Sequence, residues 1–129
     1  MKSKSKVNIP TLKIDEIKLS GSSYVNYGKI WSAAKLVEYC KEEKYPIFDL
    51  PLAGIPLDVL PWDIKDTVDF IFEMKRVLNV DTSKPIILDD KGYICDGWHR
   101  VARAILDGKK TIKAIRIIYM PVADGNITE

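Results

Sequence analysis

One short stretch, ICDGWHRVARAILDG at residues 94–108, combines residue types that can bind an anion with the start of a helical pattern. The first amides of a helix have no intrahelical partner, and the helix dipole makes that end partly positive. With Asp96 as the helix cap, Gly97, Trp98 and His99 fall in the first turn, where glycine lets a phosphate approach the backbone closely. The stretch therefore predicts a phosphate site, and its alternative is a well-capped helix with no ligand.

Basic side chains are concentrated around this stretch, although the chain as a whole is nearly neutral. Residues 98–119 contain six basic residues and one acid. The net charge is +2, and leaving out the three lysines of residues 1–6 reduces the 20 basic residues to 17, against 18 acidic ones. A protein that coats duplex DNA usually carries a larger basic excess. The charge pattern therefore favours a local anion ligand, and we expect any DNA binding to be weak.

The composition predicts one domain in the cytoplasm. A chain of 129 residues with 47% hydrophobic residues can form a single core. Cys40 and Cys95 do not have the spacing of a disulfide framework or a metal site, so we expect two buried thiols. No apolar run approaches the ~20 residues that span a bilayer, and the start lacks the apolar core of a signal peptide, so no membrane partner is expected. We predict a flexible basic tail over 1–10, a domain over 11–120 and a C-terminal tail over 121–129.

The first half of the chain predicts strands and helices in alternation. Hydrophobic periodicity and turn residues indicate the following elements: a strand over 12–20, a turn over 20–23, a helix over roughly 29–43, a strand over 45–52 and a structured loop over 53–63. The strand over 45–52 has prolines at both ends, which is typical of a sheet edge.

The second half predicts a helix, a hairpin, a second helix and a strand. Asp63 is the expected cap of the first of these helices, and its apolar stripe is Ile64, Val68, Ile71, Met74 or Lys75, and Leu78. Residues 85–88 and 93–95 form the hairpin, in which the Asp89–Asp90 pair makes the turn and Gly92 takes the left-handed position. The next helix runs from about Gly97 to Asp107, with Gly108 closing it, and a strand follows over 111–119.

The hairpin that ends in DGWHR, the alanine-rich helix and the Gly-Lys-Lys turn into a strand together resemble the ParB/sulfiredoxin superfamily. The resemblance covers residues 84–118 well and extends more loosely to LPLAGIPLDVLPW at residues 50–62. It implies an α+β fold: a ParB/sulfiredoxin-like single domain whose mixed sheet has a β-hairpin leading into a phosphate-binding helix N-terminus. In that superfamily the corresponding turn binds nucleotide phosphates.

Members of the superfamily differ at this turn. Sulfiredoxins carry Gly-Gly-Cys-His-Arg and use the cysteine for their chemistry. Free serine kinases carry Asp-Gly-His-His-Arg and transfer phosphate from a nucleotide. Partition proteins carry Gly-Glu-Arg-Arg and bind CTP and DNA. By position, Gly97, His99 and Arg100 match the phosphate-binding residues of the first two groups. Asp96 matches the acid of the kinase motif, which would interact with magnesium or with the acceptor hydroxyl. Trp98 replaces both the sulfiredoxin cysteine and a kinase histidine, so sulfiredoxin-type reduction is not expected and kinase chemistry stays open.

The resemblance thus implies a nucleotide-binding protein that uses ATP or another nucleotide with Mg²⁺. As an enzyme it would be a phosphotransferase for a small-molecule acceptor, or a nucleotide hydrolase. Asp96 and His99 are the candidate catalytic residues, with Asp58 of the preceding loop as a candidate general base or, alternatively, a solvated turn residue. Gly97, Trp98, His99 and Arg100 are the candidate nucleotide ligands, and Asp96 is the candidate metal ligand.

Two alternatives come from other classes. One is a DNA-binding ParB-like module of the partition or nuclease type, which is disfavoured because no helix-turn-helix pattern follows the motif. The other is a catalytically inactive nucleotide sensor or interaction module, which Trp98 would permit. Trp31 and Trp62 are expected in packing, with base stacking as the alternative. The base identity, the acceptor and the oligomeric state are not determined by the sequence.

Two residues give the sharpest expectations. Arg100 is expected to be exposed, so that alanine there weakens nucleotide binding and leaves the fold intact. Gly97→Ala should be neutral or stabilising if Gly97 is an ordinary helical residue, and it should abolish binding if a phosphate approaches the backbone there. A positive φ at Gly97 would instead make alanine destabilising.

Overall fold

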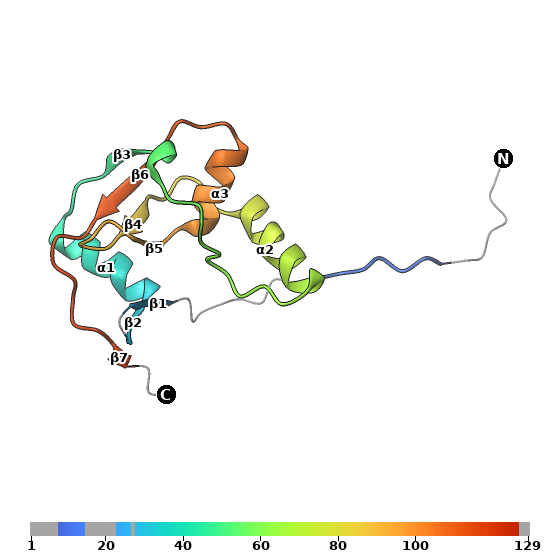
Figure 1. The fold of residues 1–129 in the computed structure, drawn as a ribbon, viewed down its shortest axis with the longest axis horizontal. Coiled ribbons are helices and arrows are strands. Elements are labelled where there is room, and N and C mark those ends of the chain that lie inside the picture. Colours follow the sequence, from blue (N-terminus) through green and yellow to red (C-terminus); the bar gives the residue numbers. More distant parts are fainter. Residues whose placement is uncertain (1–7, 15–22, 27, 127–129) are drawn as a thin grey trace.

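The computed structural model describes residues 8–14, 23–26 and 28–126. These residues form a mixed α and β structure (Figure 1) with the following elements in chain order: β1 (Ser23–Asn26), β2 (Lys29–Ser32), α1 (Ala33–Glu43), β3 (Phe48–Pro51), the 3-10 helix η1 (Leu52–Gly54), α2 (Thr67–Asn79), β4 (Ile86–Leu88), β5 (Ile94–Asp96), α3 (Trp98–Leu106), β6 (Thr111–Arg116) and β7 (Gly125–Asn126). The expected combination of helices with a mixed sheet is confirmed. No helix in the described ranges is long and apolar enough to cross a membrane.

The centre of the fold is a four-stranded sheet with the order β3-β6-β4-β5. β4 and β6 are parallel, whereas the β3–β6 and β4–β5 pairs are antiparallel. Because successive side chains of a strand point to opposite faces, β4 divides its residues between two core clusters. Ile86 and Leu88 pack with Val101 of α3, and Ile87 packs with Leu36 and Cys40 of α1. The sheet therefore lies between α3 on one face and α1 on the other.

The helix expected over 29–43 begins four residues later, because its first part is a strand. Ser32 caps α1, its hydroxyl accepting a hydrogen bond from the Lys35 amide at 3.4 Å. The residues before it form β2, in which Trp31 lies opposite Tyr24 of β1. Trp31 is buried, as expected of a packing residue. β-Branched and aromatic residues that can pair across a strand favour β structure over a helical turn.

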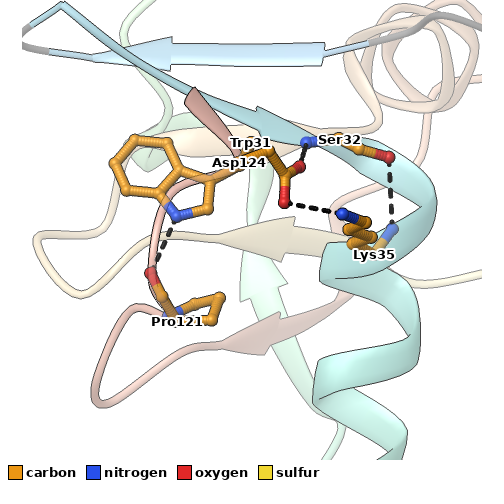
Figure 2. A network of polar contacts seen from close by, with 5 residues as sticks. All are labelled: Trp31, Ser32, Lys35, Pro121 and Asp124. Atoms are coloured by element: carbon orange, nitrogen blue, oxygen red, sulfur yellow. Dashed lines mark hydrogen bonds and ion pairs between the residues drawn. The ribbon is translucent and has the colours of Figure 1, made fainter. Parts of the chain in front are cut away.

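The segment that follows β6 packs against the domain as far as residue 126, although residues 121–129 were expected to form a tail. Figure 2 shows the contacts. The Trp31 Nε1 donates to the Pro121 carbonyl at 2.8 Å, and the Ser32 amide donates to the Asp124 carboxylate at 2.7 Å. Lys35 Nζ donates to the same carboxylate at 3.1 Å. These contacts place β7 beside β2, giving a second sheet with the order β1-β2-β7.

The expected cap and apolar stripe of α2 are both wrong. Asp66, not Asp63, caps the helix and accepts from the Asp69 amide at 2.9 Å. Among the stripe residues, Val68 and Leu78 are exposed, whereas the buried residues of α2 are Glu73 and Val77. The inward face of α2 is centred on Glu73 and Val77, so a polar side chain is directed at the neighbouring helix α3.

The β4–β5 hairpin and α3 agree with expectation. The turn contains Gly92 with φ +91°, and its amide donates to the Asp89 carbonyl at 3.1 Å. The buried Asp89 carboxylate accepts from the amides of Lys91 and Tyr93, which confirms its role as a turn former, and also from the Tyr24 hydroxyl at 2.6 Å. α3 ends before Gly108, which has φ +72°.

The remaining expected strands have mixed outcomes. β3 is an edge strand, as its prolines predicted, and the expected loop over 53–63 contains only one short 3-10 turn. β6 ends at Arg116, three residues before the expected end of that strand. The strand expected over 12–20 is absent from residues 12–14, and its other residues lie outside the described ranges.

Candidate functional site

The start of α3 joins the sheet to the helix without a side-chain cap. Asp96 was expected to be the cap, but it is the last residue of β5, and Gly97 occupies the cap position with φ +113° and ψ +19°. The first bond within the helix runs from the Val101 amide to the Gly97 carbonyl at 3.0 Å. The amides that precede Val101 in this first turn are thus left without a capping side chain, and such groups can donate to a ligand.

The close surroundings of Gly97 are protein atoms. A Cβ atom at Gly97 would lie 2.5 Å from Cγ2 and 2.8 Å from Cβ of Ile86. The positive φ also disfavours any side chain there. Both observations give a structural reason for glycine, so close approach of a phosphate is not needed to explain this residue.

Arg100 is mostly buried, with 16% of its side chain exposed, and the expectation of an exposed side chain is wrong. Its Nη1 donates to the Pro85 carbonyl at 3.0 Å and to Asp96 Oδ2 at 3.3 Å. Its Nε is buried and has no hydrogen-bond partner within the described part of the chain. The guanidinium therefore joins the residue before β4 to the end of β5 and leaves a buried Nε–H unpaired.

His99 is held between α2 and the loop that precedes it. Its Nε2 lies 3.3 Å from Glu73 Oε2, and its ring stacks on Trp62 with a centroid distance of 4.7 Å and an interplanar angle of 23°. Burial lowers the pKa of His99, and the positive charge of Arg76 lowers it further, while the contact with Glu73 opposes both effects. Arg76 Nη1 is 3.7 Å from the other oxygen of the buried Glu73 carboxylate. We expect a neutral imidazole at pH 7.

A pocket of about 470 Å³ opens at the start of α3. All five residues of the expected motif line it: Asp96, Gly97, Trp98, His99 and Arg100. The other side chains that give it chemical character come from α2 and the preceding loop: Trp62, Asp63, Asp69, Phe72, Glu73 and Arg76. The exposed Asp58 is not among its lining residues, so the structure does not bring this candidate base to the motif.

The contribution of α2 to the pocket was not expected from the sequence. Glu73 and Arg76, three residues apart, lie on the face of α2 that meets α3. The available signal was an acid and a base three residues apart within the predicted helix. The apolar stripe that we predicted for this helix is wrong. It placed Glu73 and Arg76 on the solvent side, so the sequence analysis did not identify them as pocket residues.

Two further expectations concern Cys95 and the metal. Cys95 is buried, and burial together with the nearby Asp89 charge raises the pKa of its thiol, as suits an unreactive cysteine. Within the described ranges, no group of three or more His, Cys, Asp or Glu residues is arranged to hold a metal ion. Asp96, the candidate metal ligand, has Arg100 as its ion-pair partner.

Comparisons of the chain with protein-family models, with curated proteins and with solved structures gave no match. The resemblance to the ParB/sulfiredoxin superfamily therefore stays a prediction, based on the motif and its context in residues 84–118.

Proposed function

We propose that this protein binds a nucleotide as its Mg²⁺ complex in the pocket at the start of α3. The observation that carries the proposal is the composition of one pocket: an uncapped helix N-terminus, two arginines and three aromatic side chains all line it. Free amides at a helix start and guanidinium groups bind phosphate oxygens. A volume of about 470 Å³ is within the range of small-molecule sites.

The charge of the pocket supports a metal complex over the free nucleotide. Four carboxylates line it, those of Asp63, Asp69, Glu73 and Asp96, against the guanidinium groups of Arg76 and Arg100. With His99 neutral, the lining side chains carry a net negative charge, which would repel a polyphosphate that has no bound Mg²⁺. Mg²⁺ in proteins is commonly held by one or two carboxylates together with phosphate oxygens, and it neutralises both. Asp96 is the best placed of the four because it directly precedes the helix start.

The aromatic side chains support a nucleotide over a simple phosphate. Trp62 already stacks on the His99 ring, and Trp98 and Phe72 line the same pocket. Stacking of a base on an aromatic side chain contributes about 1–3 kcal/mol and tolerates any base. We therefore expect a preference for nucleotides over inorganic diphosphate, with little discrimination between bases from stacking alone.

A binding role without turnover is the second candidate, and the position of Asp58 favours it. Phosphoryl transfer to an acceptor hydroxyl needs a base within reach of that hydroxyl. Asp58 lies outside the pocket, and within the pocket the His99 Nε2 is engaged by Glu73. Transfer to a small-molecule acceptor, or hydrolysis, would therefore require Asp63, Asp69 or Asp96 as the base.

Calorimetric titration with ADP, ATP and CTP, each with Mg²⁺ and with EDTA, tests the proposal. We expect binding that depends on Mg²⁺. Arg76→Gln should weaken it by about 10–100-fold, which corresponds to the roughly 1.5–3 kcal/mol of a charged hydrogen bond. Arg116→Gln is the matched control, because Arg116 lies outside the pocket and binds the Asp90 carbonyl.

Lack of binding by all three nucleotides in the presence of Mg²⁺ would refute the proposal, and equal affinities of the two arginine variants would remove this pocket as the site. For a protein that binds, release of phosphate from ATP over hours, followed by ³¹P NMR, separates hydrolysis from binding alone.

A further inference from the structure

A second pocket, of about 570 Å³, lies on the α1 side of the four-stranded sheet. Its floor is apolar and is made by α1 and the sheet: Val37, Cys40, Ile87 and Ile115. Figure 1 shows α1 on the side of this sheet away from α2 and α3, which form the pocket described above. The second pocket therefore opens towards a different part of the surface.

The rim of this pocket is basic. Lys41, Lys44 and Lys84 line it together with Arg100, and among the described residues the only carboxylate in its lining is that of Asp96. Asp96 is already paired with Arg100. None of the three lysines has an ion-pair partner within the described ranges. The rim therefore keeps a positive charge, which the Asp81 carboxylate offsets only from beyond ion-pair distance of Lys84 and Arg100.

Two separate segments bring these lysines together. Lys41 is in the last turn of α1 and Lys44 is its C-cap, whereas Lys84 precedes β4. Lys44 has φ +55°, and it is the only non-glycine residue of the described ranges with a positive φ. Glycine is the common residue at such a helix end, so a lysine there places a charge at the pocket at some conformational cost.

We infer that the second pocket binds an amphipathic anion, meaning a small molecule with a carboxylate or phosphate head group on an aliphatic or aromatic body. The lysines and Arg100 would hold the head group, because hydrogen bonds from charged donors to an anion are stronger than those between neutral groups. The body would lie on the apolar floor, where its removal from water is favourable. A nucleotide fits this pocket less well, because Tyr45 is the only aromatic residue that the described part of the chain contributes to its lining.

Arg100 gives the inference a second basis. It lines both pockets, and its buried Nε has no hydrogen-bond partner within the described part of the chain. An anionic head group in the second pocket would compete with Asp96 for this guanidinium. The inference shares Arg100 and Asp96 with the proposed nucleotide site, but the three lysines and the apolar floor lie outside that site, so anion binding can be tested in the absence of nucleotide.

Isothermal titration of the full chain with octanoate, octyl phosphate and octanamide tests the inference. The amide is the uncharged counterpart of octanoate, so we expect at least tenfold tighter binding of octanoate or of octyl phosphate, and the tighter of the two identifies the head group. The Lys41→Met/Lys84→Met variant should weaken binding of that anion by about tenfold. Lys109→Met/Lys110→Met, with the same loss of charge on the exposed turn before β6, should leave it unchanged.

Three results would overturn the inference: no binding of either anion, equal binding of octanoate and octanamide, or equal effects of the two double variants. An added variant, Ile47→Glu, places an acid at an exposed lining position and should abolish anion binding without loss of stability. Retained anion binding by a folded Ile47→Glu protein would also overturn it.

Discussion

Replacing Gly97 with alanine should destabilise the protein, for reasons that can be given in distances and angles. The residue has φ +113°, and a Cβ atom there would lie 2.5 Å from Cγ2 of Ile86, which is fully buried in the core. Forcing a non-glycine residue into a positive φ costs about 1–2 kcal/mol. Overpacking a buried contact adds about 1–3 kcal/mol. We therefore expect the free energy of unfolding to fall by about 2–5 kcal/mol.

Such a loss is large compared with the roughly 5–15 kcal/mol of a typical domain. Urea unfolding followed by circular dichroism measures it directly, and the melting temperature should fall by roughly 10 °C or more. Gly54→Ala is the matched control. A Cβ atom at Gly54 would meet no atom of the described residues within 4 Å, and the φ of Gly54 is not positive, so its replacement should change the stability by less than about 1 kcal/mol.

A Gly97→Ala protein as stable as the parent would refute this reasoning, because neither the backbone angle nor the Ile86 contact would then constrain the residue. If that stable variant also lost nucleotide binding, close approach of a phosphate would become the better explanation of the glycine. Nucleotide affinity and stability should therefore be measured on the same sample.

Three other predictions concern the interior and the charge. Burial lowers the pKa of His99, so the unfolded chain binds more protons than the folded one as the pH falls through about 6.5. The free energy of unfolding should therefore decrease as the pH falls through this range. His99→Asn should make it less dependent on pH, as measured by urea titrations between about pH 8 and 5. Asp89→Ala removes the acceptor of two amides and of the Tyr24 hydroxyl and should cost at least about 3 kcal/mol in urea unfolding, whereas Asp90→Ala, at the exposed neighbour, should cost far less. Duplex DNA binding at physiological salt should be weak in a fluorescence-anisotropy titration and should vanish on deletion of residues 1–6; retained, sequence-selective binding would instead favour a partition-type module.

Features set by a few adjacent residues could be predicted from the sequence. The hairpin turn follows from the Asp-Asp-Lys-Gly run, the end of α3 follows from Gly108, and the edge position of β3 follows from its prolines. The five residues of the motif at 96–100 line one pocket. The turn and the helix end depend on torsion angles and hydrogen bonds between residues close in the chain.

Features that depend on tertiary contacts could not be predicted from the sequence. Asp63 and Asp66 are equally good caps by residue type, and in the structure the cap is Asp66, next to which Asp69 accepts from the Lys65 amide. The packing of α2 against α3 decides that Glu73 meets His99 across 26 residues of sequence. The sequence shows a glycine at position 97 but not the Ile86 side chain that requires it.

The pairing of β7 with β2 has a consequence for the order in which the chain folds. The β1–β2 and β4–β5 pairs close short loops, whereas the Trp31–Pro121 and Ser32–Asp124 bonds join residues 90 and 92 positions apart. Closing a longer loop costs more chain entropy, and contacts between distant residues form slowly. β7 should therefore dock after the four-stranded sheet has formed, and it should be the first strand to detach in the native protein. Native-state hydrogen exchange can test this, because the Asp124 amide, which donates to the Ile30 carbonyl, should then exchange well before the amides of β4.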